Sequence, residues 1–176
     1  MAKTASSAVS GTSGRHGRGI QFQMGTRGTL DTVTLEGNAD AALFLDKPGR
    51  EGEAVYVLDC LLTGTSPADV PDTGETSGDG LVLSQHDAGV DPAEYLAIVQ
   101  GTTFSDNPRA HLLVESVGLQ VDGESIFGSG NDFPFVSQGG AIVEGVGGGE
   151  PEQSPEELGA ADALGIDSEP INVAVP

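Results

Sequence analysis

Alternation of apolar and polar positions dominates the middle of the chain. Ile20, Phe22 and Met24 alternate with polar residues, which is the period of a strand with one buried face. The run 54–63 is apolar on both faces and predicts a strand covered on both sides. The run 111–121 is the longest extended candidate. Because helical periodicity is nearly absent, the pattern predicts an all-β protein.

Turn residues divide this region into short segments. Lys47-Pro-Gly49 is a clear turn, residues 64–80 form a long loop, and Asp122-Gly123 is the strongest hairpin signal. Residues 20–146 therefore read as about nine short strands, which is typical of two packed antiparallel sheets. We expect a single jelly-roll or β-sandwich with extended N- and C-terminal arms.

The two ends differ from this central domain in composition. Residues 1–19 form a basic Gly/Ser-rich arm, and residues 147–176 form an acidic tail that begins with a glycine hinge. Ser154-Pro-Glu-Glu157 predicts the start of a short helix, with Ser as the cap and Pro in the first turn. The tail ends in an alternating apolar segment that could add a strand to a neighbouring sheet edge. Its apolar residues are Ile171, Val173 and Val175.

The charge of the chain predicts the environment in which the protein works. The chain has 27 Asp and Glu against 7 Lys and Arg, for a net charge of −20. Such a surface repels itself in dilute buffer, whereas at 1 M salt the Debye length falls to about 3 Å. Since the acids are spread over the predicted strands as well as the ends, we expect a protein from an extreme halophile. The alternative is an ordinary acidic protein with disordered ends.

The start of the chain is the exception, because residues 1–30 contain four bases and no acid, while the whole acid excess follows in residues 31–176. This predicts an arm that contacts something anionic: an acidic neighbouring subunit, anionic lipid headgroups or packaged nucleic acid. We expect no specific nucleic-acid recognition, because the main surface would repel phosphates. The basic residues of this predicted partner-binding arm are Lys3, Arg15, Arg18 and Arg27.

Catalytic signatures are missing from the sequence. It contains no G-x-S-x-G, P-loop, H-E-x-x-H or C-x-x-C motif. His16, His86 and His111 are far apart, and Cys60 in an apolar run is most simply a small buried hydrophobic residue. We therefore expect a protein that is not an enzyme and has no organic cofactor.

A structural cation such as Ca²⁺ or Na⁺ is the remaining chemical option. The stretch 128–133 matches part of a calcium-binding nonapeptide, although that repeat works only in tandem stacks. The alternative is that these carboxylates are simply solvated. The candidate ligands are Asp72, Glu75, Asp79 and Asp132.

The stretches 95–100 and 111–123, together with the acidic composition, resemble a known family. In size and layout the chain is similar to the smaller single-jelly-roll capsid protein of internal-membrane icosahedral haloarchaeal viruses. The resemblance covers residues 20–146 and implies upright barrels that form capsomers, with chain ends near the membrane or adjacent subunits. The implied location is the capsid shell of the virion, after assembly from the host cytoplasm. The implied partners are copies of the chain, other virion proteins and anionic membrane lipid.

Two other classes remain open. One is a decoration, turret or tail protein of a tailed haloarchaeal virus, which would also be β-rich and armed. The other is a cellular halophilic β-sandwich binding module. Carbohydrate modules usually need stacking aromatic rings, and this chain has no Trp and only Tyr56 and Tyr95, which disfavours that class.

Overall fold

The structure is a computed structural model that describes residues 2–4, 17–23, 25–49, 53–70 and 73–166. Within these residues it contains sixteen strands and one short 3-10 helix, η1 (Pro92–Glu94). The prediction of an all-β protein is confirmed.

The strands form three sheets, and every pairing between them is parallel. Sheet A has the order β1 (Ala2–Thr4), β4 (Val33–Glu36), β7 (Leu61–Thr63), β10 (Thr103–Ser105), β13 (Ile126–Phe127). Sheet B has the order β16 (Glu156–Leu158), β14 (Phe133–Gln138), β11 (Ala110–Glu115), β8 (Asp79–Ser84), β5 (Ala41–Asp46), β2 (Ile20–Phe22). Sheet C has the order β15 (Ile142–Gly145), β12 (Gly118–Val121), β9 (Leu96–Gln100), β6 (Val55–Leu58), β3 (Gly28–Asp31).

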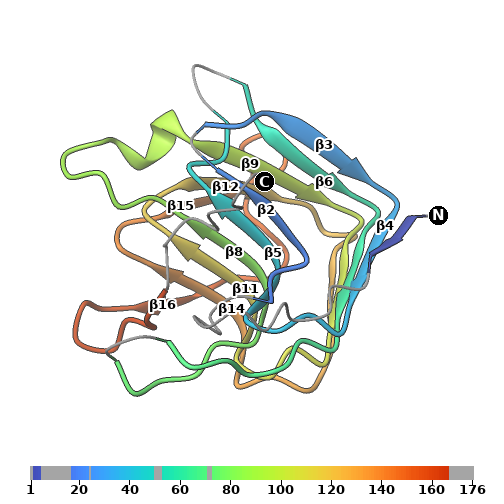
Figure 1. The fold of residues 1–176 in the computed structure, drawn as a ribbon. Helices are drawn as coiled ribbons and strands as arrows, with labels where there is room; N and C mark the ends of the chain where they lie inside the picture. The colour runs from blue at the N-terminus through green and yellow to red at the C-terminus, as the bar shows by residue number, and fades with distance from the viewer. Residues whose placement is uncertain (1, 5–16, 24, 50–52, 71–72, 167–176) are drawn as a thin grey trace, which may run out of the picture.

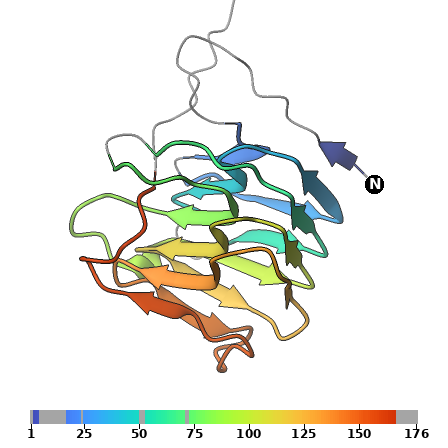
Figure 2. The ribbon, with the colours of Figure 1, turned by 90° about the horizontal axis from the view of Figure 1, so that it is seen from below.

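From β3 to β15 the chain visits sheets C, A and B in turn, so that each strand pairs with one a full coil later. The result is a parallel β-solenoid, which Figure 1 shows end-on and Figure 2 from the side. Equivalent residues stack along its axis, as Leu30, Val57, Val99 and Val121 do in sheet C.

The jelly-roll part of the prediction is not confirmed, because a jelly roll is built from antiparallel strands. The predicted hairpin at Asp122-Gly123 is wrong, since β12 before it and β13 after it belong to different sheets. Asp122 instead ties two coils together: its carboxylate accepts hydrogen bonds from Gly101 N at 3.0 Å and from Ser125 N at 3.0 Å.

Left-handed backbone conformations turn the chain at the corners between sheets. Thr32, Asp59 and Gly101 have φ values of 57°, 50° and 57° and follow β3, β6 and β9 at one corner. Asp59 thereby divides the predicted strand 54–63 into β6 and β7. Ser116, with φ of 55°, divides the predicted strand 111–121 into β11 and β12. Non-glycine residues seldom adopt this conformation, so the sequence did not reveal the breaks.

The interior of the solenoid holds the main apolar core, to which all three sheets contribute. Phe104, Phe127 and Phe135 stack inside it, with ring centroids 5.1 and 5.6 Å apart. Cys60 is buried in this core, as predicted.

The coils differ in length. The coil that leads from β5 to β8 is longer than the coil that leads from β11 to β14, although both bring neighbouring strands of sheet B into register. The longer coil contains most of the predicted loop 64–80, whose described residues before β8 belong to none of the three sheets.

The predicted helix after Ser154 is wrong. Residues Glu156–Leu158 form β16, which pairs with β14 at the end of sheet B. The local capping signals are overridden because the edge of β14 offers backbone hydrogen-bond partners and Leu158 packs on the sheet.

Candidate interaction surfaces

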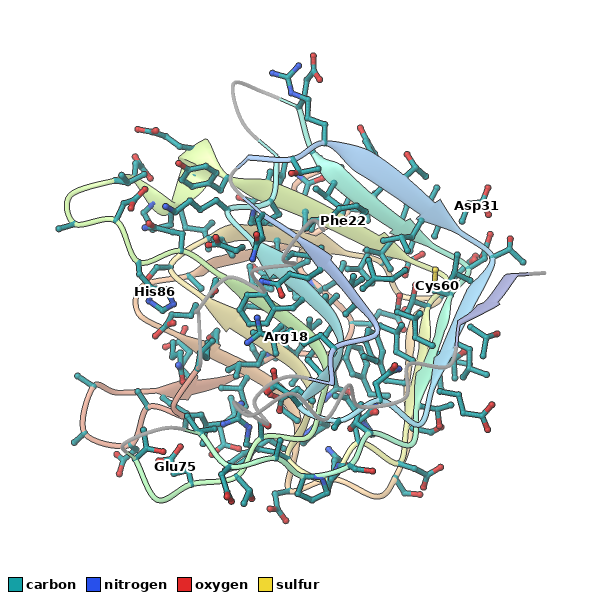
Figure 3. All side chains as sticks on the ribbon, in the orientation of Figure 1. Arg18, Phe22, Asp31, Cys60, Glu75 and His86 are labelled. Carbon is teal, nitrogen blue, oxygen red and sulfur yellow. The ribbon has the colours of Figure 1, made fainter. Side chains whose placement is uncertain are left out.

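The predicted basic arm is divided by the structure. Arg18 is buried against sheet B, where Figure 3 shows it in the middle of the view. Its Nε donates to Asp40 Oδ2 at 2.6 Å, and its guanidinium carbon lies 3.7 Å from the centroid of the Phe44 ring. Arg18 therefore links the segment before β2 to β5, and its side chain makes its contacts inside the molecule.

The other three basic residues have different positions. Arg27 forms an exposed ion pair with Glu53, at 2.7 Å. Lys3 lies in β1, where it is in register with Thr34 of β4. Arg15 lies outside the described residues, as do the tail residues Ile171, Val173 and Val175.

Two of the predicted metal ligands meet a guanidinium. Arg109 Nε donates to Asp79 Oδ1 at 2.9 Å, and its Nη2 donates to Asp79 Oδ2. Glu75 Oε2 lies 4.0 Å from Arg109 Nη1. Burial raises the pKa of the Asp79 carboxyl, and the bonds from Arg109 and from Ala110 N oppose that rise. The guanidinium of Arg109 thus supplies the positive charge beside Asp79, at the position where the sequence predicted a cation.

The other two candidate ligands do not complete a metal site. Asp132 is exposed, and Asp72 lies outside the described residues. Across the part of the chain that the structure describes, no group of three or more His, Cys, Asp or Glu side chains is placed to hold a metal ion.

Residues 159–166, here called the strap, are held by polar side chains of sheet B and its loops. Gln138 Nε2 donates to Leu164 O at 2.8 Å, and Leu164 N donates to Gln138 Oε1 at 2.9 Å. Gly165 O accepts from Arg109 Nη1 at 2.7 Å, and Gly165 N donates to Glu75 Oε2 at 2.8 Å. Side chains of the solenoid therefore bind the backbone N–H and C=O groups of the strap, as they would bind those of a peptide ligand.

The strap covers a second apolar cluster on the outer face of sheet B. Leu164 and Ile166 of the strap pack against it, together with Phe133 and Leu158. Apolar residues on the outer face of a solenoid need such a cover, because otherwise they would be exposed to water. The buried members of the cluster are Ala41, Phe44, Val82, Ala110, Leu113 and Val136.

A polar column runs beside this cluster and was missed by the sequence analysis. The strand register aligns Asp46, Ser84, Glu115 and Gln138 across β5, β8, β11 and β14. Burial raises the pKa values of Asp46 and Glu115, and His86 Nδ1 lies 3.5 Å from Glu115 Oε2. The column therefore brings the carboxyl groups of Asp46 and Glu115 to corresponding ends of β5 and β11. Its signal in the sequence is the polar residue that ends each strand.

His111 is buried at a corner of the coil and has a structural role. Its Nε2 lies 3.2 Å from Gly128 O, and its Nδ1 lies 3.2 Å from Asn107 Nδ2. These partners require an Nε2–H donor and an Nδ1 acceptor, which is the neutral ring. Burial lowers the pKa of His111 below its ordinary value of 6.5. Asn107 also donates to Leu62 O at 3.0 Å and so links neighbouring coils.

The two ends of the solenoid are built from parts of the sequence that differ in composition. The N-terminal end is formed by β1, β2 and β3. All residues of these strands lie in the acid-free range 1–30, except Asp31 at the end of β3. The C-terminal end is formed by β13, β15 and β16, within the range 110–176, which contains many acids and neither Lys nor Arg. Figure 2 shows the two ends at the top and the bottom of the stack of coils.

Exposed apolar residues concentrate at the C-terminal end. Ile126, Ile142 and Val146 expose 59%, 40% and 41% of their surface in or next to the last strands, and Tyr56 exposes 39% in β6. A cavity of about 470 Å³ has Val146 in its lining, together with four acids. These acids are Asp122, Glu124, Glu150 and Glu152.

Within the described ranges, no helix is long and apolar enough to cross a bilayer. Comparisons with protein-family models, with curated proteins and with solved structures find no match to the chain.

Proposed function

We propose that the protein is a non-enzymatic structural component of an assembly in concentrated salt, namely a virion protein of a haloarchaeal virus. The observation that carries this proposal is the acid excess of the chain, which has 27 Asp and Glu against 7 Lys and Arg. In a solenoid, position in the sequence becomes position along the axis. The later coils therefore have the most one-sided charge, since residues 110–176 contain neither Lys nor Arg.

The acidic surface sets the conditions under which such an assembly is stable. In molar salt the repulsion between carboxylates is screened, and burial of apolar surface is strengthened by salting-out ions. Association then adds to the stability of each subunit by mass action. Copies of the chain and other virion proteins are the partners in this proposal, and contact of the N-terminal residues with anionic lipid remains part of it.

The topology favours one virion role over the other. Upright barrels in a capsid shell were expected from a jelly roll, whereas the parallel solenoid stacks its coils along one axis. Such a stack suits a decoration, turret or tail protein, which must project from or extend along a particle. We therefore place the protein among the attached or projecting virion proteins.

Salt dilution tests the proposal directly. The protein is prepared in molar salt and diluted to about 0.1 M, where the Debye length is about 10 Å. Sedimentation velocity and circular dichroism should show loss of the assembled species and then of the fold. Electron microscopy of the brine sample should show particles or rods. A monomer at every protein concentration in brine would contradict the proposal and favour the cellular binding module.

A further inference from the structure

We infer that the polar column on the outer face of sheet B binds a hard monovalent cation, which is Na⁺ in brine; the inference rests on the proposed function only for the presence of molar salt. Its ligands are the hydroxyl of Ser84 and the carboxylate of Glu115, and Asp46 adds a second negative charge in the same row. The site is distinct from the cation site that the sequence predicted, where Arg109 supplies the positive charge.

The strand register places these side chains in one row. Asp46, Ser84 and Glu115 are partners across β5, β8 and β11, which are neighbours in sheet B (Figure 1). Neighbouring strands are about 4.8 Å apart, and partners in a parallel ladder point to the same side of the sheet. That side is the outer one, because the preceding residues Leu45 and Leu83 pack in the interior core. Ser84 therefore stands between two carboxylate residues.

Two oxygen atoms of this row are buried without a hydrogen-bond partner. Ser84 is fully buried, and neither its Oγ nor Glu115 Oε2 has a partner among the residues that the structure describes. The other carboxylate oxygen, Glu115 Oε1, accepts from Gln138 Nε2 at 3.2 Å. Buried polar atoms in folded proteins are nearly always bonded, so two unpaired oxygens on neighbouring strands indicate a bound ion or water molecule.

The basic side chains that act on Asp46 have other carboxylates as partners. Lys47 Nζ donates to Asp87 Oδ1 at 2.9 Å. Arg18 Nε donates to Asp40 Oδ2 at 2.6 Å. Each of these charges is therefore shared with an acid outside the row.

Glu115 has a weak counter-charge in His86. The His86 Nδ1 atom lies 3.5 Å from Glu115 Oε2 and is positive only when the ring is protonated. Burial raises the pKa values of Glu115 and Asp46, because their charged forms are incompletely compensated. A cation between Ser84 and Glu115 would offset the negative charge of the row, whereas a neutral water molecule would not.

The ligand set suits a hard monovalent ion. A carboxylate and a hydroxyl are oxygen ligands, which hard cations prefer, and water completes the coordination shell. The described residues hold no group of three or more His, Cys, Asp or Glu placed for a metal ion, so a tight divalent site is not expected here. A dissociation constant of about 0.1 M suffices for Na⁺, because molar salt then exceeds it about tenfold and stabilises the fold by mass action.

The test compares two cations at one ionic strength and one pH, with the full-length protein at a low, constant concentration. Urea unfolding is measured in about 1 M NaCl and in about 1 M tetramethylammonium chloride, whose cation is too bulky to be coordinated by side chains of adjacent strands. For wild type, exchange of Na⁺ for tetramethylammonium should raise the equilibrium constant of unfolding about tenfold.

Variants locate this effect in the polar column. Ser84→Ala and Glu115→Gln each remove one ligand and should reduce the change on cation exchange to about twofold or less. The matched control is Glu144→Gln, which removes an exposed carboxylate from β15 of sheet C and should keep the wild-type response. If Glu115→Gln does not fold, Ser84→Ala decides alone, since no described residue bonds to the Ser84 hydroxyl.

Two outcomes would overturn the inference. An equal response of wild type and all variants would show a general effect of salt on the acidic surface. Equal stability of wild type in the two salts would leave a water molecule as the occupant. The proposed function fails by a different result, because a protein that is monomeric in brine at every concentration contradicts assembly whatever its response to the cation.

Discussion

Arg109 and Asp79 connect successive coils of sheet B through a buried two-point ion pair. Asp79 is the first residue of β8, and Arg109 immediately precedes β11. Arg109 also donates to the strap at Gly165 O, at 2.7 Å. One guanidinium thus links two coils and the C-terminal segment that covers them.

Removal of Arg109 should strongly destabilise the fold. Arg109→Met leaves Asp79 buried without its charged partner, which costs about 3–5 kcal/mol in such pairs. Urea unfolding at constant molar salt measures the change. Asp79→Leu combined with Arg109→Met should recover much of the loss, because no charge is then left unpaired. Arg27→Gln, which breaks the exposed pair with Glu53, should cost at most about 1 kcal/mol.

Acid should weaken the fold through His111. Burial lowers its pKa in the folded state below 6.5, so the unfolded chain binds the proton more readily. This contribution to the free energy of unfolding is complete above pH 6.5 and is lost as the pH falls towards the folded-state pKa. The pKa values of Asp46 and Glu115 are raised in the folded state, so these two groups favour the fold as the pH falls. The effect of His111 is therefore measured by comparing a His111 variant with wild type.

His111→Gln should therefore remove part of the fall in stability between about pH 7 and pH 5. Urea unfolding of wild type and of His111→Gln at several pH values measures it. An unchanged pH dependence in His111→Gln would show that the ring is not the group responsible.

Loss of apolar contact from the strap should expose the outer face of sheet B. Leu164→Ser should reduce the free energy of unfolding by about 1–2 kcal/mol, since Leu164 is partly buried against the cluster. Binding of a hydrophobic dye to the folded variant should rise. Ala161→Ser, at an exposed position of the same segment, serves as the control. Equal behaviour of the two variants would mean that the strap adds nothing to the cluster.

Cys60 should resist alkylation in the native protein. Burial raises the pKa of its thiol, and its Sγ lies 3.2 Å from Leu58 O, so both thiolate content and access are low. Labelling in molar salt should be many times slower than in urea. Rapid native labelling would indicate local opening between β6 and β7.

The sequence predicted the local properties of the chain well and the pairing of its strands poorly. Alternation at Ile20 and Phe22 correctly indicated a strand, because it depends on which side of the backbone is buried. It carries no information on strand direction, so the run 111–121 was taken as one strand and Asp122-Gly123 as a hairpin. The corner at Ser116 depends on a left-handed conformation that a serine rarely adopts.

The candidate surfaces divide in the same way. The charge difference between the ends was visible in the sequence, and so was the burial of Cys60. The pairs Arg18 with Asp40 and Arg109 with Asp79 join positions that are distant along the chain, which no local pattern connects.

The amino-acid sequence was sufficient to predict a β-structured chain that is basic at its start and acidic in its later part. The folded molecule was needed to learn that the strands run parallel, that Glu75 and Asp79 meet a guanidinium, and that residues 159–166 cover sheet B. The difference lies in the range of the interactions. Burial and charge act residue by residue, whereas a parallel ladder pairs each strand with one that lies a full coil away along the chain.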